Sequence, residues 1–167
     1  DARALAEKCR DYYDNKQWTP AELAALKKRN QPDTVINRIK SKIDFMIGSE
    51  IATRSDPKAF PRNPGQDEEA AQAATDSLRY IGDINRFNAK KTDVYENMLI
   101  EGLGGCKIEA KPEKKEKNHR IAITRIHWDR IFFDPASRER DLGDALYRGE
   151  YLWMELADVI DMFPDKK

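Results

Sequence analysis

The sequence predicts an α+β protein with a helical N-terminal half of long antiparallel helices, followed by a small, mostly antiparallel sheet and a C-terminal helix. Up to about residue 103, apolar side chains recur at steps of three and four, which is typical of amphipathic helices. From residue 106 onward they alternate with polar side chains, which is typical of half-buried strands. We therefore expect a helical region over residues 1–104 and a small β-rich region with a closing helix over residues 105–167.

Five helices are expected in the helical region, over residues 2–14, 20–29, 34–53, 66–87 and 90–103. Thr19 is suited to cap the second of these helices, and Pro20 suits its first position. The third helix has the clearest apolar stripe, and Asp33 or Thr34 is its expected cap. A glycine-rich stretch predicts the end of the fifth helix.

The prolines between residues 55 and 65 predict an irregular loop, and Phe60 is expected to anchor it to the body of the protein. Strands are expected at residues 106–111, 121–124, 131–133 and 147–154, with a helix over residues 155–163. In the first strand, Cys106, Ile108 and Ala110 form the apolar face. The charged loop over residues 111–119 is interpreted as a solvated hairpin connection.

Charge balance restricts the kind of protein this is. The chain has 167 residues, with 30 Lys plus Arg and 30 Asp plus Glu, so its formal net charge is zero. That balance argues against an autonomous polyanion-binding protein, which carries a clustered positive excess. No apolar run approaches the ~20 residues of a membrane helix, and no charged-then-apolar stretch opens the sequence, so we do not expect a secreted protein. The chain begins within a helical pattern and ends just after a proline, so we expect it to be part of a longer protein.

A search for chemically active motifs predicts no catalytic residue, cofactor or metal site. Cys9 and Cys106 lie far apart and are interpreted as reduced thiols. His119 and His127 do not form the close ligand pairs that zinc sites use. The glycines over residues 102–105 follow a helix and open a strand, whereas a phosphate-binding loop follows a strand and opens a helix.

Two alternatives stay open at this point. A metal-dependent nuclease or phosphoesterase would use the acidic cluster over residues 129–144, which contains Asp129, Asp134, Glu139, Asp141 and Asp144. Arginines are interleaved there, so ion pairs within the loop or across a subunit boundary are the preferred interpretation. A nucleic-acid-binding adaptor would use the basic residues of 111–117, although glutamates interrupt them and aromatic residues are lacking.

A series of short motifs resembles one known family. The most specific series combines Trp128-Asp129, Asp134-Pro135 and Ser137-Arg138 within residues 126–145. Further motifs are Tyr12-Tyr13-Asp14-Asn15-Lys16-Gln17-Trp18, Asn37-Arg38-Ile39 with Gly48, Ser55-Asp56-Pro57-Lys58 and Phe60-Pro61-Arg62. Together they resemble the N-terminal portion of portal proteins, the head-to-tail connectors of short-tailed bacteriophages, over nearly the whole chain.

The resemblance implies a structural subunit rather than an enzyme, with no catalytic residue and no cofactor. It implies a homo-dodecameric ring at one capsid vertex, the conduit for DNA packaging and ejection and the platform for terminase and tail attachment. Further implied partners are adaptor, capsid and scaffold proteins. Transient, non-specific contact with double-stranded DNA through the ring is implied for the whole assembly but not for particular residues here. No membrane is involved.

The implied location is the portal vertex of the virion, with the host cytoplasm during assembly. The segment would form a wing-like part of the subunit, and the clip, stem and crown would lie beyond residue 167. Isolated residues 1–167 are expected to be monomeric. The motif residues expected to serve the structure or subunit interfaces are Trp18, Arg38, Trp128, Asp129, Phe132, Asp134, Pro135, Arg138 and Asp141.

Overall fold

A computed structural model of the protein describes residues 2–63, 65, 67–112, 119–139 and 141–163. The chain forms two compact units, Asp1–Arg125 and Ile126–Lys167. The prediction of an α+β fold is confirmed, because the described residues contain six α-helices and two small two-stranded sheets.

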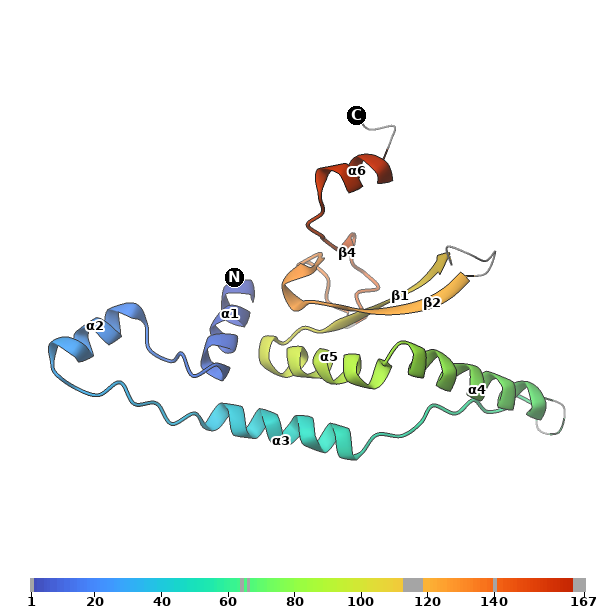
Figure 1. Ribbon diagram of the computed structural model, residues 1–167, viewed down its shortest axis with the longest axis horizontal. Coiled ribbons are helices and arrows are strands. Elements are labelled where there is room, and N and C mark those ends of the chain that lie inside the picture. Colours follow the sequence, from blue (N-terminus) through green and yellow to red (C-terminus); the bar gives the residue numbers. More distant parts are fainter. Residues whose placement is uncertain (1, 64, 66, 113–118, 140, 164–167) are drawn as a thin grey trace. The chain divides into compact units, whose positions relative to one another are not determined.

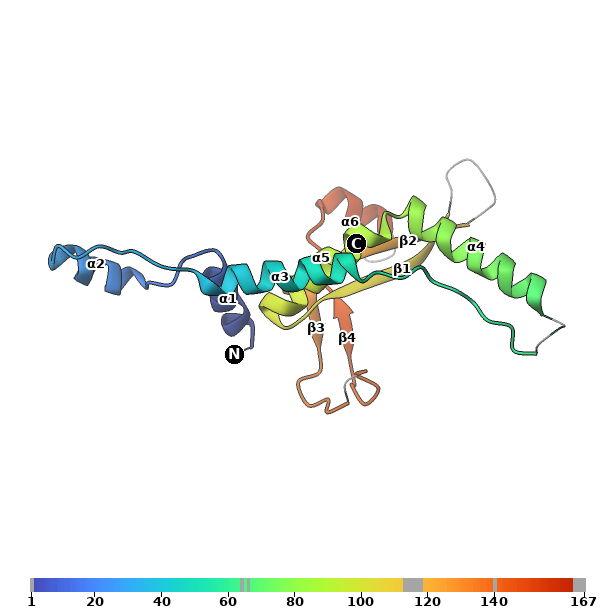
Figure 2. The same cartoon turned by 90° about the horizontal axis from the view of Figure 1, so that it is seen from below.

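The first unit is built around one central helix. It contains α1 (Ala2–Tyr13), α2 (Pro20–Lys28), α3 (Arg38–Ala52), α4 (Glu68–Ile84), α5 (Phe87–Glu101), β1 (Gly105–Pro112) and β2 (His119–Ile126, which ends at the unit boundary). The five expected helices are thus confirmed. Helix α5 contacts α1, α3, α4 and β1 (Figure 1). Helix α2 lies at the tip of an arm made of two extended segments in both views (Figure 2).

The second unit contains a short 3-10 turn, η1 (Trp128–Arg130), the strands β3 (Ile131–Phe133) and β4 (Arg148–Glu150), and helix α6 (Leu156–Met162). Strands β3 and β4 pair antiparallel, with Phe132 opposite Gly149. The strand expected over residues 147–154 is therefore shorter than predicted, because β3 has only three residues to pair with it. Trp153, which follows β4, is 88% exposed.

The start of α2 confirms its predicted cap. The side chain of Thr19 accepts a hydrogen bond from the backbone N–H of Glu22, and the carboxylate of Glu22 accepts one from the N–H of Thr19. This reciprocal capping box satisfies two backbone donors at the helix start. Pro20 occupies the first turn, as expected. The bonds that begin this helix therefore come from residues close together in the sequence.

Helix α3 begins four residues later than predicted, and its cap is Asn37 rather than Asp33 or Thr34. The side-chain oxygen of Asn37 accepts from two N–H groups in the first turn of α3, each at 3.1 Å. Its amide nitrogen donates to the carbonyls of Tyr12 and Tyr13, at 3.1 and 2.9 Å. One side chain thus starts α3 and ties it to the end of α1. Because of these bonds to α1, the helix begins at Arg38, although the apolar pattern of the sequence predicts an earlier start.

The irregular loop before α4 is anchored by Thr75, and the prediction that Phe60 anchors it is wrong. Phe60 is 76% exposed, with the ammonium of Lys58 5.4 Å from its ring centroid. Thr75 is 3% exposed, and its hydroxyl oxygen accepts from the N–H of Ala59 at 3.0 Å. The same hydroxyl donates to the carbonyl of Ala71 at 2.9 Å. A buried polar group with both roles satisfied holds the loop more directly than an apolar side chain left in solvent.

The junction between α4 and α5 fastens the helices to the first sheet. Arg86 adopts a left-handed φ of 49°, which separates the two helices. The side-chain amide of Asn85 donates to the carbonyl of Ile121 at 3.0 Å and accepts from the N–H of Ile123 at 2.9 Å. Lys90 also donates to the carbonyl of Ile123. Asn85 therefore bonds β2 as a residue of a neighbouring strand would, and part of the free edge of this strand is covered.

Burial along the first sheet differs from the predicted alternation. Ile108 is 70% exposed, so the expectation of an apolar face buried along the whole of β1 is wrong. Among the described helices of the first unit, α5 contacts β1, but this contact leaves Ile108 uncovered. In β2, by contrast, Ala122 and Ile123 are both buried.

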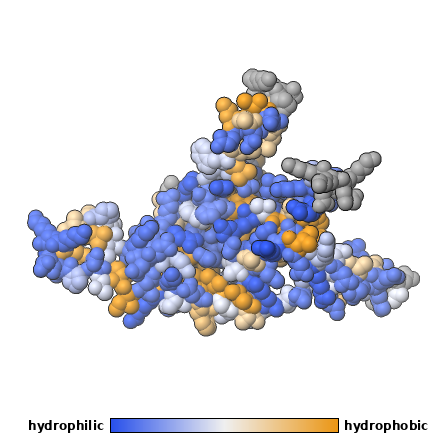
Figure 3. Space-filling view, viewed as in Figure 1, coloured by the Kyte–Doolittle hydropathy of each residue, from blue (hydrophilic) through white to orange (hydrophobic). Residues whose placement is uncertain are grey.

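The buried apolar core is small for a chain of this mass. Among the described residues, the buried hydrophobic side chains are Ala6, Ile100, Ala122 and Ile123. The exposed area is 13956 Å², compared with roughly 8,500 Å² expected for a compact monomer of this mass. Figure 3 shows hydrophobic surface among the hydrophilic residues that dominate this face. None of the described helices combines the length and apolar character needed to cross a bilayer.

Candidate functional site

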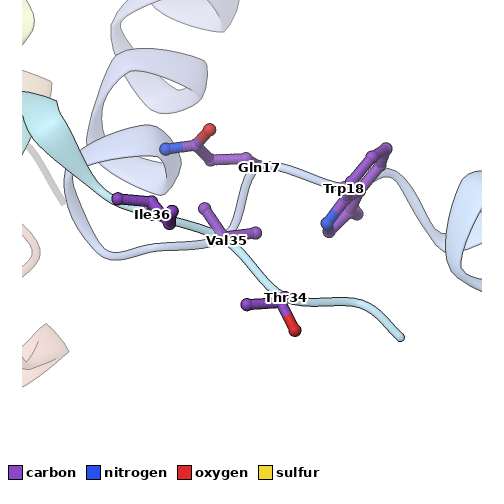
Figure 4. A pocket seen from close by; sticks show the side chains of 5 residues that line it. All are labelled: Gln17, Trp18, Thr34, Val35 and Ile36. Atoms are coloured by element: carbon purple, nitrogen blue, oxygen red, sulfur yellow. The ribbon is translucent and has the colours of Figure 1, made fainter.

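An open hollow lies at the base of the arm that carries α2. Its volume is about 270 Å³, and its walls are Gln17, Trp18, Thr34, Val35 and Ile36 (Figure 4). The first two residues come from the segment before α2 and the other three from the segment after it. None of the five side chains titrates in the physiological range, so the hollow offers no general acid or base. Trp18, a predicted interface residue, is thus placed in the arm.

The acidic cluster of the second unit shapes a loop. Asp134 is 6% exposed and follows β3 directly. Its Oδ1 accepts from the N–H of Ala136 at 2.9 Å, and its Oδ2 accepts from the N–H of Leu146 at 3.2 Å. The backbone N–H of Asp134 also donates to the carbonyl of Tyr147 at 2.9 Å. One buried carboxylate therefore holds together the two ends of the loop between β3 and β4.

Asp144 organises the first part of the same loop. Its carboxylate accepts from the hydroxyl of Ser137 at 2.5 Å, and from the N–H groups of Arg138 and Glu139 at 2.8 and 3.3 Å. Asp141 accepts from the N–H of Gly143 at 3.1 Å. The described contacts of these carboxylates are thus made with backbone amides and a hydroxyl, rather than with the side chains of the interleaved arginines.

These hydrogen bonds also set the acidity of the loop. The hydroxyl of Ser137, followed by the N–H of Arg138, lowers the pKa of Asp144 below its ordinary value of 3.8. A lowered pKa in the folded state means that Asp144 stabilises the loop above pH 3.8 and loses this effect as the pH falls through the folded-state pKa.

We therefore expect acidification below pH 3.8 to loosen the loop between β3 and β4, and we expect a return to neutral pH to reverse this effect. The protection of the amides near Ser137 and Arg138 against hydrogen exchange, corrected for the pH dependence of the intrinsic exchange rate, should fall in acid and recover on neutralisation. The variant Asp144→Asn should exchange quickly at neutral pH as well. Equal protection of these amides in wild type and variant would contradict this role of Asp144.

The remaining motif residues fasten the start of the second unit. Nδ1 of His127 lies 2.6 Å from Oδ1 of Asp129, and the rings of His127 and Trp128 lie 5.9 Å apart between centroids. The hydroxyl of Tyr151 donates to the backbone carbonyl of Asp129. Across the strand pair, the Phe132 ring covers the α-carbon of Gly149, where an added Cβ would lie 2.7 Å from the ring.

The predicted motif residues are therefore divided between the two units. Trp18 lies in the arm, and Arg38 is an exposed residue at the start of α3. The other seven belong to the second unit, where Asp134, Pro135, Arg138 and Asp141 share one loop. Pro135 and Arg138 are exposed, whereas Asp134 is buried. The described contacts of Asp129, Phe132, Asp134 and Asp141 support the local fold of the second unit.

An ionic cluster between α1 and α5 was not predicted from the sequence. Nε of Arg10 donates to Glu101 at 2.5 Å, and its Nη1 donates to Glu96 at 3.0 Å. The side chain of Glu101 is fully buried, at 0% exposure. Burial alone would lower the pKa of Arg10, but the hydrogen bonds that it donates to Glu101 and Glu96 outweigh burial and raise it. These residues tie α1 to α5.

A second cluster ties α3 to α5. Arg54 forms two hydrogen bonds with Glu50, at 3.1 and 2.8 Å, and also donates to the hydroxyl of Thr92. Nζ of Lys91 lies 3.3 Å from the same glutamate. The hydrogen bond from Arg54 contributes most to lowering the pKa of Glu50. Only the pair of Glu50 and Arg54, four residues apart at the end of α3, is recognisable from sequence.

The geometry does not favour the alternative of metal-dependent chemistry. Within the described residues, no group of three or more His, Cys, Asp or Glu side chains is arranged to hold a metal ion. The acidic residues of the loop already accept backbone hydrogen bonds. Cys9 and Cys106 are free thiols, and burial raises the pKa of Cys106. The basic loop considered for nucleic-acid binding lies largely outside the described residues, which end at Pro112 and resume at His119.

Large apolar side chains, in contrast, are widely exposed. Phe45 on α3 is 75% exposed, Ile36 before it 80%, and Leu146 in the second unit 90%. A water-soluble monomer rarely leaves so much apolar surface uncovered, whereas a subunit of an assembly buries it against neighbours. Hydrogen bonds made by polar side chains hold each unit together, while large apolar side chains remain exposed. This combination is typical of a structural subunit, a protein whose role is to assemble with others.

The comparison with protein families agrees with this class. The chain belongs to the family described as Phage P22-like portal protein, which matches residues 1–167. No curated protein matches the chain. The predicted resemblance to phage portal proteins is thus confirmed. The family is structural, and membership implies assembly with other portal subunits and with capsid or tail partners at the portal vertex of the virion.

Proposed function

We propose that this chain forms a wing-like part of a subunit in a homo-dodecameric portal ring, the conduit through which phage DNA is packaged and ejected. The observation that carries this proposal is the family match over residues 1–167. In the complete subunit, the ring would be the platform for terminase, tail and adaptor proteins, within a capsid built on scaffold. The regions over residues 1–104 and 105–167 would together form the wing-like part.

Two physical properties support this role. The formal net charge is zero, which suits a wall that DNA slides past, because strong phosphate binding would hold the DNA in place. Exposed apolar residues surrounded by charged ones suit a subunit that meets its neighbours through polar-rimmed contacts. In this proposal the exposed motif residues Pro135 and Arg138 contact other proteins, while Asp134 holds their loop in shape.

Ring formation by the full-length subunit tests the proposal. Purified full-length protein should form closed rings in negative-stain images, with twelve-fold symmetry in class averages. Sedimentation should show one large species in equilibrium with monomer. A full-length protein that stays monomeric at every concentration would refute the proposed ring.

Residues 1–167 alone are expected to remain monomeric, because other parts of the complete subunit would supply much of the ring contact. Sedimentation velocity over a wide range of concentrations measures this directly, with full-length protein as the control. A stable dodecamer formed by residues 1–167 alone would show that this region contains the whole ring contact.

A further inference from the structure

Two helices of the first unit each expose charges of one sign along one face, and the two signs are opposite. On α3, Ile43 and Ile47 lie on the face that is partly buried, whereas Arg38, Lys42 and Phe45 are exposed. Those three residues recur at steps of four and three, so they share one face of the helix. Phe45 is 75% exposed. This α3 stripe is therefore basic at its start and aromatic at its middle.

Helix α4 has the complementary pattern. Glu69, Asp76 and Asp83 recur every seven residues, so they form one stripe along the helix, and all three are exposed. Tyr80, on the edge of this stripe, is 66% exposed. The buried Thr75 lies on a different face. The α4 stripe therefore carries three carboxylates, with the exposed Arg79 on its flank and one aromatic side chain beside it.

These charges are not neutralised within the part of the chain that the structure describes. Ion pairs formed elsewhere in the first unit do not include the two cations of the α3 stripe or the three carboxylates of the α4 stripe. Asp76 accepts only a neutral hydrogen bond, from Gln72 at 3.0 Å. Each stripe thus has charge available for a partner.

The positions of the charges are also unfavourable for the isolated helices. Arg38 and Lys40 occupy the first turn of α3, which contains no acidic residue, although a helix N-terminus carries partial positive charge. Asp83 occupies the last turn of α4, which contains no basic residue, although a helix C-terminus carries partial negative charge. An antiparallel partner helix would offset both unfavourable charge placements, because it brings the start of one helix beside the end of the other.

We propose that the α3 stripe of one subunit docks antiparallel on the α4 stripe of the neighbouring copy of this chain. The inference rests on the proposed ring and specifies one of its contacts. With a rise of about 1.5 Å per residue, pairing Arg38 with Asp83 places Lys42 level with Arg79 and about 4.5 Å along the axis from Asp76, toward which its flexible side chain extends. Phe45 and Tyr80 supply the apolar part of the contact. Two different faces meet, so the contact is head-to-tail, as a closed ring requires.

Charge reversal in the full-length subunit tests this contact. Arg38→Glu with Lys42→Glu should raise the concentration needed for half-assembly at least about tenfold, and so should Asp76→Lys with Asp83→Lys. Combining all four substitutions should restore assembly. Arg38→Glu and Asp83→Lys place favoured charges at their helix ends, so each helix itself is not weakened. Arg62→Glu with Arg120→Glu is the matched control, because both residues are exposed and the charge change is equal.

A cross-link gives an independent result. Lys42→Cys combined with Asp76→Cys should form disulfides between subunits on oxidation, giving a ladder of covalent multimers in a non-reducing gel. Each single cysteine variant should give no ladder. The proposed contact is wrong if the wild-type protein forms rings and the charge-reversal variants assemble as readily as it does. It is also wrong if the wild-type protein forms rings and the cysteine pair gives no ladder. Either result would leave the proposed ring itself standing. Wild-type protein that forms no ring would refute the proposed function itself.

Discussion

Replacing Arg10 by Met is expected to lower the free energy of unfolding by about 3 kcal/mol, because it leaves a buried carboxylate without its cation. The side chain of Glu101 is 0% exposed, and Arg10 donates to it at 2.5 Å. The same guanidinium donates to Glu96 at 3.0 Å and so joins two turns of α5 to α1. Urea unfolding followed by far-ultraviolet circular dichroism measures the loss.

A second variant separates the lost ion pair from lost packing. Arg10→Met combined with Glu101→Met removes both charges and should recover much of the stability lost in the single variant. Arg10→Lys keeps the charge but not the two-pronged geometry, so an intermediate loss is expected. A single variant as stable as wild type would contradict the role of this cluster, and so would a double variant no better than the single one.

Replacing Asp134 by Ala is expected to destabilise the second unit by about 2–3 kcal/mol, because two backbone N–H groups lose their acceptor. These groups belong to Ala136 and Leu146, at opposite ends of the loop between β3 and β4. The strand pair that flanks the loop is only three residues long, whereas the bonds of Asp144 and the backbone bond from Asp134 to Tyr147 remain in the variant. Tryptophan fluorescence in a Trp18→Phe background reports the second unit through Trp128 and Trp153.

The matched variant here is Asp134→Asn, which retains one acceptor oxygen and should lose about half as much stability. Deuterium uptake over residues 134–147 should follow the same order, highest in the alanine variant. If the alanine variant unfolds at the same denaturant concentration as wild type, Asp134 does not close this loop.

Periodicity in the sequence was sufficient for the helices and the fold class. The predicted helix over residues 20–29 is found as Pro20–Lys28, because Thr19 and Glu22 cap it within one turn. Hydrogen bonds between residues this close in the chain can be predicted from the sequence itself. The family was also recognisable, since the motifs over residues 126–145 combine several residues in a fixed order and the match covers the chain.

Bonds between distant residues explain what sequence could not predict. Asn37 moves the start of α3 by bonding to the end of α1, more than twenty residues earlier. Arg10 and Glu101 are 91 residues apart, and nothing in their local sequences distinguishes them from surface charges. The exposure of Phe60 and Ile108 follows from a first unit that covers few of its apolar residues.

The predicted site residues show the same difference between local features, which the sequence reveals, and contacts between distant residues, which it does not. Asp134, with proline after it, was recognisable as a turn residue and as part of a family motif, but its buried bond to Leu146 depends on how the loop closes. Arg38 was recognisable only through the family motif. Its proposed part in the contact between subunits rests on its exposed position beside Lys42 and Phe45, which requires the helix to be in place.

The central claim is that this chain acts by packing against copies of itself, and a cryo-EM reconstruction of the assembled full-length protein tests it most directly. The reconstruction should show closed rings in which exposed apolar residues such as Phe45 and Leu146 are covered by neighbouring protein. A full-length protein that forms no ring, with these residues in solvent and a ligand held in an enclosed pocket, would contradict the claim.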